Sequence, residues 1–193
     1  MPIGSSTPSP RDERVDAIVR AAIPVFAAHG YRRTSMALLA DAAGVSRPAL
    51  YQYFDDRADL FRAGFGLLLE EATDAALAAL DEVDGLEEQL DAYLQRLSGD
   101  GYESLSDTDF GAELMEARHE FASDVAAAAL DRAHRGLEVH LRRHTGADRR
   151  TRVDAYDLLT LSPAGFKGDQ PTPATYRRRL RSLARAAAKI LAD

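Results

Sequence analysis

The sequence predicts an all-α protein, and three observations favour this fold class. Apolar residues recur three and four positions apart over most of the chain, which is the spacing of one helix face. No segment alternates apolar and polar residues for long enough to form a half-buried strand. The chain has 193 residues, 46% of them hydrophobic, and no cysteine, so its core has to be stable without disulfides.

The first helix is expected to begin just after a Ser- and Pro-rich segment. We expect residues 1–9 to be disordered, because they are mostly small and polar and bury little apolar surface. Ser9 and Pro10 precede acidic residues at positions 12 and 13, which is the pattern of a capped helix start. Apolar positions then continue at helical spacing towards Gly30, a residue type that commonly ends a helix.

Two short helices separated by a glycine are expected next. The first covers residues 36–43, and Gly44 then permits a tight turn. Ser46 is a suitable N-cap for the second helix, whose buried face contains Leu50 and Phe54, four residues apart. This arrangement predicts a helix-turn-helix, the unit that places its second helix in the major groove of DNA.

The second of these helices has two rows of side chains that face away from the core. Arg47 and Tyr51 form one row and Pro48 and Gln52 form the other, since each pair is four residues apart. An arginine can donate twice to a guanine edge and a glutamine can pair with adenine, whereas proline and tyrosine can contact thymine methyl groups. We therefore expect these four side chains to read bases.

Three stretches of this region resemble the DNA-binding domain of the TetR family of bacterial regulators. They run from Phe26 to Ser35, from Leu39 to Phe54 and from Arg57 to Phe61, within a resemblance that covers about residues 14–62. The resemblance implies base contacts by Arg47, Pro48, Tyr51 and Gln52, and phosphate contacts by Thr34, Ser35, Ser46, Tyr53 and Arg57. It also implies a homodimer that represses transcription from a palindromic double-stranded DNA operator and is released by a small-molecule effector.

The remainder of the chain matches this family in layout only. We expect a three-helix DNA-binding domain over residues 10–55, and a larger helical ligand-binding and dimerisation domain over residues 56–193. Helices of the second domain are expected at residues 56–83, 85–97, 108–118, 123–144, 147–161 and 172–191. The breaks between them include residues 98–101, which contain two glycines, and residues 162–173.

The last expected helix has an apolar seam suited to helix–helix packing, with residues spaced 4-3-4-3. Together with the preceding helix, it predicts a four-helix dimer interface with two-fold symmetry. The candidate interface residues are Val153, Tyr156, Tyr176, Leu180, Leu183, Ala187 and Ile190. An intramolecular core has the same spacing, and the seam alone does not distinguish the two.

An effector pocket is expected among the middle helices, since ligand sites of helical domains form between packed helices. The candidates are Phe65, Leu69, Tyr93, Leu97, Phe110, Leu114, Met115, Arg118, His119 and Phe121. Most of these residues are expected to belong to the core rather than to line a cavity. Nothing in the sequence identifies the effector.

The formal net charge of -7 is unevenly distributed, with +1 over residues 1–62, -16 over residues 63–131 and +8 over residues 132–193. An acidic total therefore does not exclude DNA binding by the near-neutral N-terminal part. No apolar run reaches the length of a membrane span, and the N-terminus lacks a signal-peptide pattern, so we expect a cytoplasmic protein. Without cysteine, thiolate metal sites and thiol redox sensing are excluded. We expect no cofactor.

The alternative function is a helical-bundle metal enzyme of the di-iron carboxylate type. Glu116 and His119 form one Glu-x-x-His motif, whereas such a site needs two of these motifs and two further glutamates. His140 and His144 are four residues apart, but the sequence offers no third ligand near them. We therefore expect a DNA-binding regulator, with neither a metal site nor an enzymatic activity.

Overall fold

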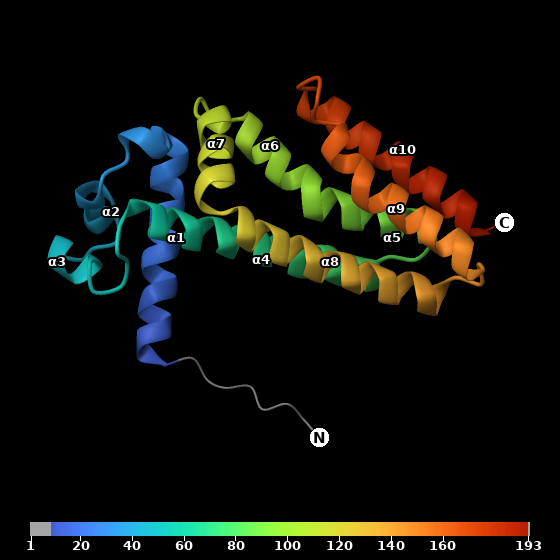
Figure 1. The fold of residues 1–193 in the computed structure, drawn as a ribbon, viewed down its shortest axis with the longest axis horizontal. Coiled ribbons are helices and arrows are strands. Elements are labelled where there is room, and N and C mark those ends of the chain that lie inside the picture. The colour runs from blue at the N-terminus through green and yellow to red at the C-terminus, as the bar shows by residue number, and fades with distance from the viewer. Residues whose placement is uncertain (1–8, 193) are drawn as a thin grey trace. The chain divides into compact units, whose positions relative to one another are not determined.

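The computed structural model describes residues 9–192, and these residues form helices joined by short turns, with no β-strand among them (Figure 1). The elements are α1 (Pro10–Arg33), α2 (Met36–Ala42), α3 (Arg47–Leu50), α4 (Arg57–Glu82), α5 (Leu86–Leu94), the π-helical turn η1 (Gln95–Gly99), α6 (Asp100–Ser106), α7 (Gly111–Phe121), α8 (Ser123–His144), α9 (Arg149–Gly165) and α10 (Pro173–Ala192). The predicted all-α fold is confirmed. We expected disorder over residues 1–9; of these, the structure describes only Ser9, and the others lie outside the described part.

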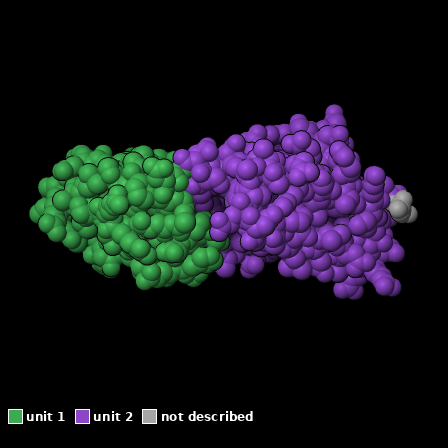
Figure 2. Space-filling model, turned by 90° about the horizontal axis from the view of Figure 1, so that it is seen from above, with its two compact units in different colours: residues 1–67, 108–123 green, residues 68–107, 124–193 purple. Residues whose placement is uncertain are grey.

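The chain divides into two compact units (Figure 2). Unit 1 contains Met1–Leu67 and Thr108–Ser123, and unit 2 contains Leu68–Asp107 and Asp124–Asp193. This division differs from the expected boundary after residue 55, because the first turns of α4 and all of α7 belong to unit 1. Helix α4 therefore contributes residues to both units.

An aromatic cluster joins α1, α4 and α7 within unit 1. Phe61 of α4 lies edge-on to Phe26 and Tyr31 of α1, with ring centroids 5.1 and 5.2 Å apart. Tyr31 in turn stacks on Phe121 of α7 at 5.0 Å. Such aromatic pairs stabilise a core by more than their buried area alone. Because these contacts join helices distant in sequence, they explain why α7 belongs with the N-terminal helices.

Gly30 allows α1 and α7 to approach each other closely. Its φ of 73° interrupts α1, and only glycine adopts this backbone conformation at little cost. A Cβ atom there would lie 2.8 Å from Phe110 Cδ1 and 3.0 Å from the Glu113 carboxylate. That carboxylate accepts a hydrogen bond from the Arg32 amide at 2.5 Å. Gly30, which we expected to end the first helix, is thus the site of a kink, and one further helical turn follows it.

Helix α10 supplies the centre of the unit 2 core. Its residues Tyr176, Leu180 and Ala187 are fully buried among side chains that include Tyr93 of α5 and Leu159 of α9. Full burial of each large apolar side chain stabilises the fold by about 1.5–3 kcal/mol. The last helix is therefore a main source of stability for this unit.

The break expected at residues 98–101 is absent, because α5 continues through η1 into α6. Gly99 is buried here, and a Cβ atom on it would lie 2.7 Å from Gln95 Oε1 and 3.1 Å from Arg177 Nη1 of α10. The glycine therefore serves the close packing of α10 against a wide helical turn, and not a reversal of the chain.

Helices α4 and α8 run side by side in the same direction within unit 2. The Thr73 hydroxyl donates to the Ala129 carbonyl at 3.4 Å, and further along the side chain of Leu77 fills the space that a Cβ on Gly136 would need. Residue numbers rise together along both helices, so their C-terminal ends lie at the same end of the unit.

Candidate nucleic-acid interface

The turn between α2 and α3 is a Schellman motif built on Gly44. The Val45 amide donates to the Ala40 carbonyl at 3.0 Å, and the Gly44 amide donates to the Asp41 carbonyl at 3.2 Å. Gly44 has a φ of 63°, as this motif requires of the residue after the helix. The predicted helix, glycine turn and second helix are therefore present within residues 36–50.

Buried side chains hold this bihelical unit in place. Leu39 of α2 and Leu50 of α3 are fully buried, and Phe54, which follows α3, is 5% exposed. These residues face the core, as their spacing predicted. The opposite side of α3 is left at the surface.

The four side chains expected to read bases are displayed together on that surface. Arg47, Pro48 and Gln52 are exposed, and Tyr51 is 43% exposed. The guanidinium of Arg47 lies 5.9 Å from the centroid of the Tyr51 ring, as an i, i+4 pair on one helical face would. A large aromatic ring this exposed on a charged face is available for contact with another molecule.

The helix that carries these residues is shorter than its sequence suggests. Regular α-helix covers only Arg47–Leu50, and the Tyr51 amide still bonds to the Arg47 carbonyl at 3.3 Å. The Gln52 amide instead bonds to the Ala49 carbonyl at 3.1 Å, which tightens the next turn towards a 3₁₀ geometry. Gln52 is therefore exposed but is not one regular helical turn beyond Pro48.

Ser35 and Ser46 cap the two helices and remain exposed. Each hydroxyl oxygen accepts a bond of 3.2 Å from the third residue of its helix, Leu38 or Ala49. A hydroxyl that accepts in this way still has its own proton to donate. Both groups are thus positioned to cap and to donate to a phosphate oxygen at once.

Thr34 behaves differently from its neighbour Ser35. It is 1% exposed, and its hydroxyl donates to the Gly30 carbonyl at 2.6 Å. The proton that would bind a phosphate is therefore used inside the protein, so the phosphate contact expected of Thr34 is wrong. Its hydroxyl instead supports the kinked end of α1.

Arg57 has a structural role that the sequence does not indicate. Its Nη1 donates to the carbonyls of Arg32 and Thr34 at 3.1 and 2.8 Å, and the guanidinium lies 4.2 Å from the centroid of the Tyr31 ring. The side chain thereby ties the start of α4 to the end of α1. Its contact with phosphate stays a prediction.

Tyr53 is half-buried, with the guanidinium of Arg11 5.4 Å from its ring centroid. Arg11 also donates to the Gln52 carbonyl at 3.5 Å. The first turn of α1 thus supports the segment after α3, a contact that no local pattern in the sequence reveals. Arg11 is thus a second cation, besides Arg47, close to the exposed side chains after α3.

Comparisons with known proteins agree with this geometry. Residues 18–63 match the family model for bacterial regulatory proteins of the tetR family. The HTH-type transcriptional activator FasR from Mycolicibacterium smegmatis is 31% identical over 163 residues, which cover 79% of this chain and 70% of FasR. The chain belongs to the TetR family. It is therefore a DNA-binding transcriptional regulator and not an enzyme.

Solved structures of TetR-family and related regulators share the fold. PfmR from Thermus thermophilus, a TetR family transcriptional regulator, has a TM-score of 0.54 and 22% identity, covering 89% of this chain and 97% of PfmR. The fatty acid degradation regulator FadR from Bacillus halodurans has a TM-score of 0.57 and 20% identity, covering 93% of this chain and 96% of FadR.

The ten residues expected to form the effector pocket of this TetR-family protein fall into two sets. Seven belong to unit 1 (Phe65, Phe110, Leu114, Met115, Arg118, His119 and Phe121), and Leu69, Tyr93 and Leu97 belong to unit 2. Leu114 and Tyr93 are core residues, whereas His119 is exposed. Burial lowers the pKa of the Arg118 guanidinium, which lies 5.7 Å from the Phe65 ring centroid.

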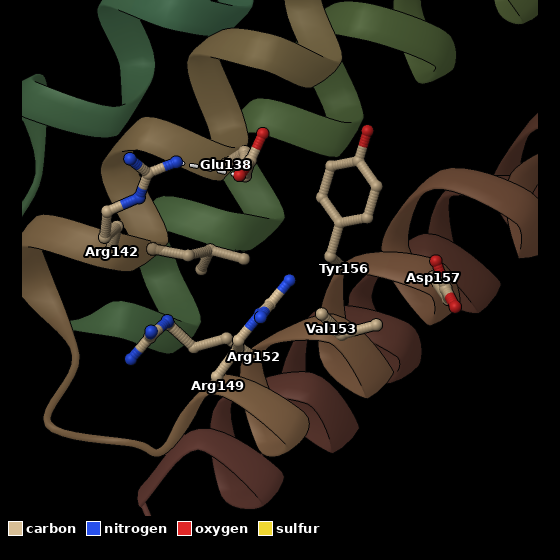
Figure 3. Close-up of a pocket in the computed structure, with 8 residues that line it drawn as sticks. Glu138, Arg142, Arg149, Arg152, Val153, Tyr156 and Asp157 are labelled. Carbon is tan, nitrogen blue, oxygen red and sulfur yellow. Dashed lines mark hydrogen bonds and ion pairs between the residues drawn. The ribbon is translucent and has the colours of Figure 1, made fainter.

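None of these ten residues lines either of two hollows found in unit 2. The larger hollow, of about 500 Å³, lies between α8 and α9 (Figure 3). It is lined by Glu138, Leu141, Arg142, Arg149, Arg152, Val153, Tyr156 and Asp157. Arg142 is paired with Glu138 at 2.8 Å, and Arg152 donates to the Ala147 carbonyl. The sequence did not predict this hollow, because its residues come from two helices without a shared motif.

The apolar seam of α10 faces the core of its own chain. Tyr176, Leu180, Leu183 and Ala187 are at most 7% exposed in the single protomer, and Ile190 packs against the same core. Placing this seam at a dimer interface is therefore wrong. The intramolecular alternative holds, because α5 and α9 already cover these side chains.

Helix α9 retains apolar residues at the surface of the protomer. Val153 is 48% exposed, Leu158 is 38% exposed and Leu161 is 71% exposed. Tyr156 is half-buried beside His134, whose ring centroid is 6.3 Å away. Of the expected interface residues, Val153 is thus the one that is clearly exposed.

The motif considered for a metal enzyme is not assembled into a metal site. Glu116 forms an ion pair with Arg32 at 3.0 Å, and His119 is exposed. Neither belongs to the group of three potential metal ligands found among the described residues. No helix between residues 9 and 192 has the length and apolar character needed to cross a membrane.

Proposed function

We propose that this TetR-family regulator is a homodimeric repressor that binds a palindromic operator and is released by a small-molecule effector. The observation that carries the proposal is the display of Arg47, Pro48, Tyr51 and Gln52 on one exposed surface, formed by α3 and the turn that follows it, opposite the buried Leu50. This combination of donors, acceptors and apolar groups matches what the major groove offers.

Each displayed side chain has a base edge that it fits. Arg47 donates twice to the O6 and N7 atoms of guanine, and Gln52 pairs with the N6 and N7 atoms of adenine. Pro48 and Tyr51 contact thymine methyl groups. The ring of Tyr51 beside the guanidinium of Arg47 limits the positions that this long side chain samples, which lowers the entropy lost on binding.

Phosphate contacts position α3 in the groove without reading sequence. We assign them to the exposed hydroxyls of Ser35 and Ser46, to the Tyr53 hydroxyl and to Arg57. The capping serines hold their hydroxyl groups at helix N-termini, where backbone amides also favour an anion.

A palindromic operator follows from a two-fold symmetric dimer, because each protomer reads one half-site. We place the dimer interface on the exposed face of α9 that contains Leu158 and Leu161. A leucine that is 71% exposed, three residues from a second exposed leucine, is the kind of apolar surface that a partner protomer covers.

The hollow between α8 and α9 is our candidate for the effector site. It has room for a small organic molecule, and its Arg142, Arg149 and Arg152 outnumber its two carboxylates. An effector with a carboxylate and an apolar part fits this lining. Since α4 contributes residues to both units, we propose that it couples the effector to the DNA-binding unit. By linkage, operator DNA then weakens effector binding by the same factor.

Selection of bound duplexes from a random DNA pool tests the proposal. A palindrome whose half-site centres are about one helical turn or somewhat more apart is the expected result. A single asymmetric site, or no enriched sequence, would contradict it. A reporter under the selected operator tests the sign of regulation, which matters because FasR is named an activator. Reporter output that rises with the protein present would overturn repression while leaving operator binding intact.

A further inference from the structure

We propose that Asp81, His140 and His144 form a binding site for a divalent transition-metal ion, with Zn²⁺ as its best-fitting occupant. One ligand atom from each of the three side chains lies within 4.8 Å of the other two. The histidines belong to α8 and the aspartate to the end of α4, so the site joins the last turns of two helices. It does not depend on the proposed function.

The donor set matches zinc chemistry. Two imidazole nitrogens and one carboxylate oxygen are ordinary zinc ligands, at about 2.0–2.2 Å from the ion, and a fourth position is then open to water or another ligand. Imidazole ligands favour Zn²⁺ over Mg²⁺ or Ca²⁺, which prefer oxygen. Around a tetrahedral ion the ligand atoms stand about 3.5 Å apart, so atoms up to 4.8 Å apart have to move inwards by about 1 Å. Asp81 and His144 are exposed and have the freedom to do so.

The two histidines are already arranged as a pair. Their rings are parallel to within 6°, with centroids 4.3 Å apart, on successive turns of α8. His140 is 6% exposed, so its ring is held by the surrounding protein. Because the lone pair of a ring nitrogen lies in the plane of its ring, the exposed His144 has to rotate out of this stack to share an ion with the buried His140.

Gln89 fixes the tautomer of His140. The Gln89 side-chain nitrogen donates to the Val83 carbonyl at 3.0 Å, which orients the amide so that its oxygen faces His140. That oxygen lies 3.1 Å from His140 Nε2 and can only accept, so Nε2 carries the proton. Nδ1 is left with the lone pair that a metal needs. A hydrogen-bonded second ring nitrogen is the usual support for a histidine ligand.

The charges around the site favour a cation. Helices α4 and α8 run in the same direction, and Asp81 and His144 lie in their last turns, so the negative ends of both helix dipoles are close to the site. The last turn of α8 also contains two arginines: Arg142 is engaged by Glu138 at 2.8 Å, which partly neutralises its charge, and Arg143 is exposed, so solvent and salt screen its charge. The sequence alone lacked a third ligand for the histidine pair, and the packing of α4 beside α8 supplies it.

The test is zinc binding by the full chain, purified with a chelator and then dialysed. Zn²⁺ is titrated against a chromophoric chelator, and Co²⁺ is used as a spectroscopic probe of coordination. We expect one ion per chain, a Co²⁺ spectrum of low-symmetry N/O coordination, and a rise of the unfolding midpoint by about 5–10 °C at a hundredfold excess over Kd.

Three variants make the test specific. His144→Gln and Asp81→Asn change exposed side chains and should each lower the zinc affinity at least tenfold. His29→Gln removes an exposed histidine of unit 1 and should leave the affinity within twofold of the wild type. Circular dichroism checks that each variant is folded. Absence of saturable binding, or equal affinity in the wild type and both site variants, would overturn the proposal.

Discussion

Replacing Arg47 with alanine is expected to weaken specific DNA binding with little change in the stability of the protein. Arg47 is exposed in the first turn of α3, and its contact within the described residues is the ring of Tyr51. An exposed cation–π contact contributes about 0.5–1 kcal/mol. For a chain of this size that free energy shifts the unfolding midpoint by only about 1–4 °C. The folded protein therefore tolerates the change.

The expected loss of affinity follows from the number of Arg47 side chains that contact DNA in the complex. One bidentate arginine–guanine contact contributes about 1–3 kcal/mol of discrimination. A homodimer on a palindrome makes this contact twice, so the variant should lose about 2–6 kcal/mol per dimer. At about 1.4 kcal/mol per factor of ten, even the lower value raises Kd roughly 30-fold.

Fluorescence anisotropy measures this effect on the selected operator and on a duplex of scrambled sequence, at one fixed salt concentration. Arg47→Ala should lose most of its operator affinity and much less of its affinity for the scrambled duplex. Arg135→Ala is the matched control, because Arg135 is exposed in unit 2 and pairs with Asp131 of its own helix at 3.7 Å. Equal losses of the Arg47 variant on both duplexes would mean that Arg47 contacts phosphate, and would refute direct readout.

Three further predictions concern stability and assembly. Arg57→Ala should lower the free energy of unfolding by about 2 kcal/mol in chemical denaturation, because two hydrogen bonds to carbonyls and a contact with an aromatic ring are lost. A change under about 0.5 kcal/mol would count against the structural role of Arg57. Leu161→Asp should give a monomer in sedimentation at micromolar concentration. The control Leu68→Asp, at another exposed leucine, should remain a dimer. The same oligomeric state for both variants would reject the α9 interface. Burial lowers the pKa of His134 below its usual 6.5, against the opposing charge of Asp131, so the folded state binds fewer protons than the unfolded state. The contribution of His134 to the free energy of unfolding is complete above pH 6.5 and declines as the pH falls. His134→Gln should therefore flatten the pH dependence of the free energy of unfolding, measured between about pH 5 and pH 8. An unchanged slope would show that another group is responsible.

The elements predicted best from the sequence are those whose determinants are local. Ser46 caps α3, and Gly44 closes the turn before it, as expected, because a cap and a Schellman motif need only a few consecutive residues. Gly99 shows the limit of this reasoning. It has the same residue type as Gly44, but it lies within a continuous helical segment because α10 packs closely on it.

Periodicity predicts that a face is buried but not by what. The spacing of Tyr176, Leu180 and Leu183 indicates a helix seam, and the seam exists, but it packs on helices of the same chain. An intermolecular partner would impose the same spacing. The pattern therefore has no information about which protomer supplies the covering side chains.

Single polar residues are the hardest to assign from the sequence. Thr34 and Ser35 are adjacent hydroxyls at a helix start, and only the second is available to DNA, because the kink at Gly30 turns the first into the core. In the same way, nothing near His140 in the sequence points to Asp81, since the two meet only when α8 packs beside α4.

The division of α3 into an inner and an outer face has an evolutionary consequence. Leu50 on the inner face fixes the helix in the domain, while Arg47 on the outer face and Gln52 in the turn after the helix are exposed and lie outside the core. In the proposed mode of DNA binding, substitutions of these exposed side chains change which DNA is recognised at little cost in folding free energy. Duplicated copies of such a regulator can therefore acquire new operators one residue at a time, with every intermediate still folded.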